Sequence, residues 1–200
     1  TGTSSVGSYG IGASAAQGTG LANYAVTYQP GTLTIDPAAL TVTALDQTST
    51  YGQAPDLGTS RFTATGLVNG DTVSSVSLTT AATGASNVGA YGITVAGATG
   101  SGLSNYAVTY QPGTLTIDPA ALTVTALDQT SAYGQAPDLG TSRFSATGLV
   151  NGDTVARVSL TTAATGASTV GAYGITAAGA TGSGLSNYAV TYQPGTLTID

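Results

Sequence analysis

The chain has 200 residues, of which nine are aspartate, three are arginine and none is lysine or histidine, so its formal net charge is −6. Nucleic-acid binding needs clustered Lys and Arg to neutralise phosphates, and the three arginines, Arg61, Arg143 and Arg157, are scattered. We therefore expect no nucleic-acid partner. The chain has no cysteine and therefore no disulfide. It also has no apolar run of 18 residues, so we expect no membrane insertion of this segment.

One segment, Asn105–Asp118, recurs unchanged twice, ending at Asp36 and at Asp200, which gives an internal period of 82 residues. Such self-similarity is typical of a tandem array, and 82 residues lie within the usual size of a domain. The sequence predicts three parts: the C-terminal part of a preceding repeat and two complete repeats, residues 1–36, 37–118 and 119–200.

The first complete repeat begins with alternating apolar and hydroxyl residues over 40–45. Alternation with period two predicts a half-buried strand with Leu40, Val42 and Ala44 on one face. The polar stretch 46–50 and the segment 51–58, which contains Gly and Pro, predict an irregular connection.

The middle of the repeat contains Asn69-Gly70 between two β-prone runs, residues 62–67 and 73–78. Asn-Gly accepts the positive φ angles of a type I′ turn, which predicts a β-hairpin. The small-residue tract 79–87 predicts a loop.

The last part of the repeat predicts a strand over 88–95 and a glycine-rich loop over 97–102. A second hairpin is expected between 106–110 and 115–117, because Pro112-Gly113 favours a type II turn. No segment has helical periodicity, so the repeat is predicted to be all-β with six or seven short strands.

The two complete repeats differ at six positions, and these test the predicted strand faces: Thr50/Ala132, Thr63/Ser145, Ser74/Ala156, Ser75/Arg157, Asn87/Thr169 and Val95/Ala177. Alternation places the side chains at 63/145 and 75/157 toward solvent. Only Val95/Ala177 falls on a predicted inward face. The smaller side chain predicts a second repeat that is less stable by about 1 to 2 kcal/mol.

The repeats are joined without a Gly or Ser spacer, through Asp118-Pro119. Proline restricts the residue before it to extended conformations. We therefore expect the tandem domains to be arranged end to end as a stiff rod.

Catalysis is not expected from this composition. General acid–base or nucleophilic catalysis needs a group that is reactive near neutral pH, and the chain has no His, Cys, Lys or Glu. We predict that the protein is not an enzyme and uses no cofactor.

The remaining side chains suggest two kinds of candidate ligand site, one for calcium and one for sugars. Calcium takes six to eight oxygens, usually from clustered carboxylates; the weak candidates in the first repeat are widely spaced: Asp46, Asp56, Asp71 and Asp118. Sugar recognition would use exposed aromatic rings, but most tyrosines alternate in phase with Val or Ile and favour core packing. Tyr51 and its counterpart Tyr133, each in a Gly-flanked connection, are the candidate ligand-facing aromatics.

Several short blocks of the repeat resemble the MBG domain of the Tyr-Gly type: Tyr51-Gly52 with Pro55, Gly66-Leu67-Val68-Asn69-Gly70-Asp71, Asn87-Val88-Gly89-Ala90-Tyr91-Gly92-Ile93, Asn105-Tyr106 and Gly113-Thr114-Leu115-Thr116-Ile117. The resemblance spans both complete repeats and residues 1–36. It implies an extracellular, bacterial cell-surface location, in large adhesin-like proteins of the filamentous-haemagglutinin kind. It also implies a β-grasp-like topology, with a small β-sandwich as the alternative.

The leading functional hypothesis is a stalk or fibre-forming segment of a bacterial surface adhesin or extracellular filament. Its partners would be neighbouring repeats of the same or like chains. One alternative is a multivalent adhesion module whose weak sites for glycans or surfaces gain avidity. Another is a biofilm-matrix fibre in which residues 1–36 are completed by a strand from another chain.

Overall fold

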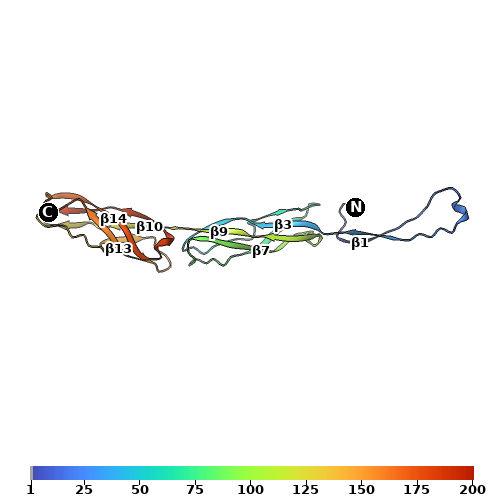
Figure 1. The fold of residues 1–200 in the computed structure, drawn as a ribbon, viewed down its shortest axis with the longest axis horizontal. Helices are drawn as coiled ribbons and strands as arrows, with labels where there is room; N and C mark the ends of the chain where they lie inside the picture. The colour runs from blue at the N-terminus through green and yellow to red at the C-terminus, as the bar shows by residue number, and fades with distance from the viewer. Residues whose placement is uncertain (1) are drawn as a thin grey trace. The chain divides into compact units, whose positions relative to one another are not determined.

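The computed structural model describes residues 2–200; Thr1, the first residue of the predicted segment 1–36, lies outside the described part (Figure 1). The described chain is all-β, as predicted, and its only helices are three-residue 3-10 turns. None of its helices has the length and apolar character needed to cross a membrane. By contacts, the chain divides into two compact units, residues 1–45, 57–79 and 93–113 in one and residues 46–56, 80–92 and 114–200 in the other.

The second unit contains the whole of the repeat 119–200, which has seven strands in two sheets. One sheet has the order β12-β10-β15 and the other β11-β16-β14-β13. The strands are β10 (Ala120–Ala126), β11 (Gln129–Ser131), β12 (Phe144–Thr147), β13 (Thr154–Thr162), β14 (Gly171–Ser183), β15 (Tyr188–Gln193) and β16 (Gly195–Ile199).

The repeat 37–118 has the same strand orders, β5-β3-β8 and β4-β9-β7-β6. Its strands are β3 (Ala38–Ala44), β4 (Gln47–Thr50), β5 (Phe62–Thr65), β6 (Thr72–Thr79), β7 (Gly89–Ser101), β8 (Tyr106–Gln111) and β9 (Gly113–Asp118). The seven strands agree with the predicted number, and β3 agrees with the predicted first strand.

The core of the second repeat lies between its two sheets. The alternation in β10 buries Leu122 and Val124 completely, and β10 contacts both β14 and β16 of the facing sheet. Those strands contribute Ile175, Leu197 and Ile199, which are almost fully buried. Two sheets that pack face to face through alternate side chains form a small β-sandwich, which was one of the two fold alternatives.

The predicted hairpin around Asn69-Gly70 is wrong, although the turn itself is present. Asn69 and Gly70 have φ angles of 57° and 78°, and the Asp71 amide donates to the Val68 carbonyl at 3.0 Å. The flanking strands do not pair with each other, because β5 pairs with β3 and β6 pairs with β7. The turn therefore carries the chain from one sheet to the other instead of closing a hairpin.

The predicted hairpin around Pro112-Gly113 is also wrong. β8 pairs parallel with β3, whereas β9 pairs parallel with β4 and lies in the other sheet. Gly113 is not among the residues with positive φ, so the type II turn is not formed. A Cβ at Gly113 would lie 2.8 Å from the Ala44 carbonyl oxygen, and this close backbone approach requires glycine.

Two further segments differ from expectation. Residues 47–50, predicted to be an irregular connection, form β4, with the Gln47 side chain buried. Most of the predicted loop 97–102 belongs to β7, which continues to Ser101. In both cases tertiary pairing imposes strand structure on residues with a weak local signal.

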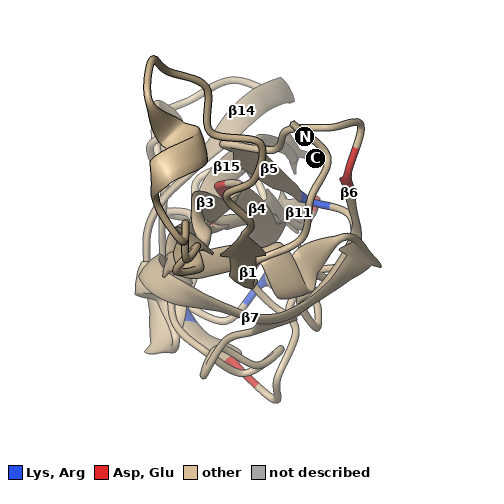
Figure 2. Ribbon diagram, turned by 90° about the vertical axis from the view of Figure 1, so that its right-hand side faces the viewer, with Lys and Arg blue, Asp and Glu red and all other residues tan. Residues whose placement is uncertain are grey.

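Charge is sparse on this fold, and Figure 2 shows few coloured residues along a mostly tan ribbon. Arg157, predicted to face solvent, is exposed on β13.

The Val95/Ala177 difference lies in the core, as predicted, because both side chains are buried. We expect Ala177→Val to raise the free energy of unfolding and Val95→Ala to lower it, each by about 1 to 2 kcal/mol, since the change adds or removes two buried methyl groups. Urea unfolding of the full chain measures both. An unchanged midpoint for both variants would show that the core adapts to the smaller residue.

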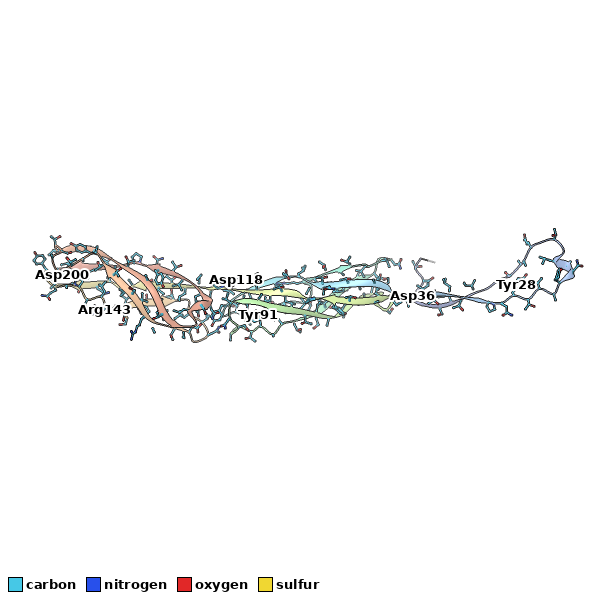
Figure 3. All side chains as sticks on the ribbon, viewed as in Figure 1. Tyr28, Asp36, Tyr91, Asp118, Arg143 and Asp200 are labelled. Carbon is cyan, nitrogen blue, oxygen red and sulfur yellow. The ribbon has the colours of Figure 1, made fainter. Side chains whose placement is uncertain are left out.

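Residues 7–35 form a two-stranded antiparallel ribbon with β1 (Gly7–Ile11) and β2 (Gly31–Ile35). Tyr28, labelled in Figure 3, lies on the segment between these strands. Most of the large apolar residues of the ribbon are exposed, among them Ile11 and Leu33.

Candidate functional site

The most elaborate polar arrangement in the second compact unit surrounds Tyr51. This residue follows β4, and its amide donates to the carbonyl of Asp118, labelled in Figure 3, at 2.9 Å. Its ring packs edge-on against Tyr188, with centroids 5.4 Å apart and an interplanar angle of 83°. Its hydroxyl donates to Asp153 Oδ2 at 2.9 Å. A residue of the first repeat is thus bound to two residues of the second.

Asp153 is the acceptor for two tyrosines. The Tyr188 hydroxyl also lies 2.9 Å from Asp153 Oδ2, and it accepts from the Val150 amide at 2.9 Å. Its second possible acceptor, the Val150 carbonyl, is farther away at 3.2 Å. Because hydrogen bonds to a carboxylate are the stronger ones, we assign the single Tyr188 proton to Asp153.

The Asp153 side chain is held against Gly184, which precedes the 3-10 turn η3 (Leu185–Asn187). Gly184 has φ +69°, and a Cβ there would overlap the Asp153 carboxylate. Glycine at this position therefore gives the carboxylate room to reach both tyrosine hydroxyls.

Three amide contacts join the same two repeats. The Asn187 side chain is buried; its Oδ1 accepts from the Val88 amide at 2.9 Å, and its Nδ2 donates to Asn87 Oδ1 at 3.0 Å. Asn151 Nδ2 donates to the Gly84 carbonyl at 3.0 Å. These bonds use polar groups that would need water if the surfaces were apart.

Gly52 brings the backbone of the first repeat close to Val150. It has φ +88°, and a Cβ there would lie 2.5 Å from Val150 Cγ2. Its counterpart Gly134 has φ +83° and nothing within 4 Å of the same position. The two glycines therefore share a backbone conformation but differ in the contact.

We expect Gly52→Ala to destabilise the chain more than Gly134→Ala. Both variants place a side chain in a left-handed conformation, which costs roughly 1 to 2 kcal/mol. Only Gly52→Ala adds a clash with Val150, worth about 1 to 3 kcal/mol more. Thermal unfolding of both single variants measures the difference. Adding Val150→Ala should relieve only the Gly52→Ala variant, and equal losses in the two glycine variants would contradict the contact.

The pKa of Tyr188 is raised, chiefly by burial and further by the Asp153 carboxylate and Tyr51. A raised pKa favours the neutral phenol in the folded state, so its stabilisation is present below the unfolded value of about 10 and is lost as pH rises through the folded pKa. We expect the free energy of unfolding to fall above about pH 10. The fall should be shallower in Tyr188→Phe; an unchanged slope in that variant would contradict this assignment.

The structure also places the residues that the sequence suggested as sugar or calcium ligands. Tyr51 is 5 % exposed, so its ring is not an open platform, whereas Tyr133 is 63 % exposed. Asp46 Oδ1 accepts from the Thr114 amide at 2.7 Å, and Asp71 Oδ2 accepts from the Tyr106 hydroxyl at 3.0 Å. Asp118 uses its backbone carbonyl, as described, and residues 2–200 contain no group of three or more acidic side chains arranged for a metal ion. Asp56, the fourth of the calcium candidates, lies in the connection after Tyr51.

Sequence reasoning selected Tyr51 but missed its partners Asp153 and Tyr188. A signal was available, because these residues belong to the short blocks that carry the family resemblance. Their convergence on one contact could not be read from the sequence, since Tyr51 and Asp153 are 102 positions apart.

The strands and this contact define a class of protein, a tandem array of small all-β repeats. The family model described as MBG domain (YGX type) matches residues 40–116 and 122–198, and the chain belongs to that family. The curated proteins contain no match to the chain.

Proposed function

We propose that the chain is a spacer segment, a stalk or fibre-forming part of a bacterial surface adhesin or extracellular filament, with no enzymatic activity. The repeats themselves are its functional units, and each repeat has the neighbouring repeats as its partners. The observation that carries the proposal is the tyrosine contact, in which Tyr51 binds Asp153 and Tyr188. A contact of this kind at each junction would restrain successive repeats and turn repeat number into reach.

Two other features support a spacer. The complete repeats differ at only six of 82 positions, so each addition would extend the array by a nearly equivalent unit. The junction has no Gly or Ser linker, and Pro119 restricts the conformations of Asp118. A flexible linker would instead be expected to be rich in Gly and Ser.

Spin-label distance measurements test the restraint between the repeats. The chain has no cysteine, so Thr63→Cys and Ser145→Cys on exposed strand positions can be labelled without background. We expect one narrow distance distribution, which broadens when Tyr51→Ala is added. The matched control is Tyr133→Ala, which should leave the distribution narrow. A broad distribution in the otherwise unchanged chain would overturn the stiff-spacer function.

A further inference from the structure

The chain contains two Asn-Gly dipeptides, Asn69-Gly70 and Asn151-Gly152, and their flanking sequences are identical, because residues 64–73 repeat as 146–155. Both form the same turn. The φ angles are 57° and 78° in the first turn and 55° and 77° in the second, and each turn is closed by a hydrogen bond of 3.0 Å. A difference in reactivity between the two asparagines must therefore come from what surrounds each turn in the fold.

An asparagine followed by glycine can lose its side-chain amide in an intramolecular reaction. The backbone nitrogen of Gly70 gives its proton to a base in the solvent and attacks Cγ of Asn69; the bond from Cγ to Nδ2 breaks, and ammonia leaves. Water then opens the resulting succinimide ring to an aspartyl or an isoaspartyl residue. Glycine favours this reaction because it has no Cβ to obstruct its nitrogen. In total, water is consumed, ammonia is released and a negative charge is added.

The closed turn prevents this reaction. In a type I′ turn the glycine nitrogen is anti to the asparagine Cβ about the Cα–C bond, so the ring cannot form until the turn opens. The rate is then the equilibrium constant for local opening multiplied by the rate in the open state. Because both asparagines are exposed, water reaches each of them. The rates should differ only through the free energy of opening.

The turn at Asn151 has a hydrogen bond that the turn at Asn69 lacks. Asn151 Nδ2 donates to the Gly84 carbonyl at 3.0 Å, whereas the Asn69 side chain has no hydrogen-bond partner within residues 2–200. Opening the turn at Asn151 therefore also breaks its bond to Gly84.

The valine before each asparagine shows the same contrast. Val150 is half-buried, and it lies so close to Gly52 that a Cβ there would be 2.5 Å from Val150 Cγ2. Its counterpart Val68 is 50 % exposed. Packing therefore restrains the second turn more than the first.

We propose that Asn69-Gly70 is a site of spontaneous covalent modification, at which deamidation converts Asn69 to an aspartyl or isoaspartyl residue, and that the surroundings of Asn151 protect it from the same reaction. The expected ratio of the two rates in the folded chain is about five- to tenfold, the factor by which one hydrogen bond shifts a local equilibrium. This chemistry is independent of the proposed spacer function.

The two products have different consequences for the fold. Aspartate, like asparagine, accepts a left-handed conformation, so the aspartyl product keeps the turn. In the isoaspartyl product the backbone passes through Cβ and Cγ and is longer, which breaks the hydrogen bond from the Asp71 amide to the Val68 carbonyl. The turn leads from β5 to β6, so the first amides of β6 should lose protection from hydrogen exchange in the isoaspartyl form. The variant Asn69→Asp should retain that protection.

The test is incubation of the purified full chain at neutral and mildly alkaline pH, followed by tryptic digestion and mass spectrometry. Trypsin cleaves after the three arginines and places the two asparagines in separate peptides, 62–143 and 144–157. We expect the mass increase for replacing an amino group by a hydroxyl to accumulate five- to tenfold faster at Asn69 than at Asn151. Both rates should rise with pH, because the nucleophile is the deprotonated glycine nitrogen.

The chain unfolded in guanidinium chloride is the matched control. Its identical flanking sequences should make the two sites react at equal rates, and both faster than in the folded chain. Gly52→Ala gives a second control, because it displaces Val150. It should raise the rate at Asn151 in the folded chain and leave the rate at Asn69 unchanged.

Three outcomes would contradict the inference. Rates at the two sites that agree within about twofold in the folded chain would show that the surroundings of Asn151 give no protection. A difference that persists in the unfolded chain would assign it to something other than the fold. A product with no isoaspartyl form at position 69 would exclude the succinimide and with it the attack by Gly70.

Discussion

Tyr51→Ala is expected to lower the free energy of unfolding by roughly 3 to 5 kcal/mol, the usual loss for truncating a buried aromatic side chain. The variant removes the edge-on packing against Tyr188 and the hydrogen bond to Asp153. Tyr133→Ala is the matched control, because Tyr133 has the same place in its repeat and a mostly exposed ring. It should change the free energy of unfolding by no more than about 0.5 kcal/mol.

Chemical unfolding of the full chain, followed by circular dichroism, measures both variants. Both tyrosine amides donate to the carbonyl of the last Asp of their own repeat, at 2.9 Å for Tyr51 and 2.8 Å for Tyr133. Because this local bond is the same in both repeats, the comparison of the two variants isolates the contact between repeats. Equal losses in the two variants would mean that the ring stabilises its own repeat and not the contact.

Asp153→Ala should have the second large effect, a loss of about 3 kcal/mol or more. It removes the acceptor of two tyrosine hydroxyls, and a hydrogen bond to a charged group contributes roughly 1.5 to 3 kcal/mol. Asp71→Ala is the control, because Asp71 accepts from Tyr106 alone among the tyrosines of residues 2–200. We expect about half the loss there.

Urea titration of the two aspartate variants gives this ratio directly. A larger loss for Asp71→Ala than for Asp153→Ala would contradict the assignment of two tyrosine protons to Asp153. The slope of each transition should stay unchanged, because neither variant alters the surface exposed on unfolding.

Local features of the fold could be predicted from the sequence. Period-two alternation identified β3 and its buried face, and Asn69-Gly70 identified a turn with two positive φ angles. Strand pairing was not predictable in the same way, because alternation shows which side chains face a core but not which strand lies alongside. β8 and β9 are neighbours in sequence, yet each pairs parallel with a strand more than 60 residues earlier, as in Leu40 with Val108 and Gln47 with Leu115.

The site was predictable only as a single residue. Tyr51 lies in a Gly-flanked connection, whereas the other tyrosines of its repeat alternate in phase with Val or Ile, and this is why it was chosen as a ligand-facing candidate. Its environment depends on Asp153 and Tyr188, which are placed by a turn and a 3-10 segment in the next repeat. No local pattern in the sequence reports contacts across such a separation. The family match to both repeats, by contrast, agrees with the resemblance carried by the short blocks.

A double-mutant cycle between Tyr51→Phe and Asp153→Ala tests the central claim most directly, because it isolates the hydrogen bond that joins the two repeats. The account predicts a coupling free energy of about 1.5 to 3 kcal/mol. A parallel cycle between Tyr133→Phe and Asp153→Ala should give a value within about 0.5 kcal/mol of zero. A coupling free energy near zero in the first cycle would contradict the claim that Tyr51 and Asp153 bind one repeat to the next.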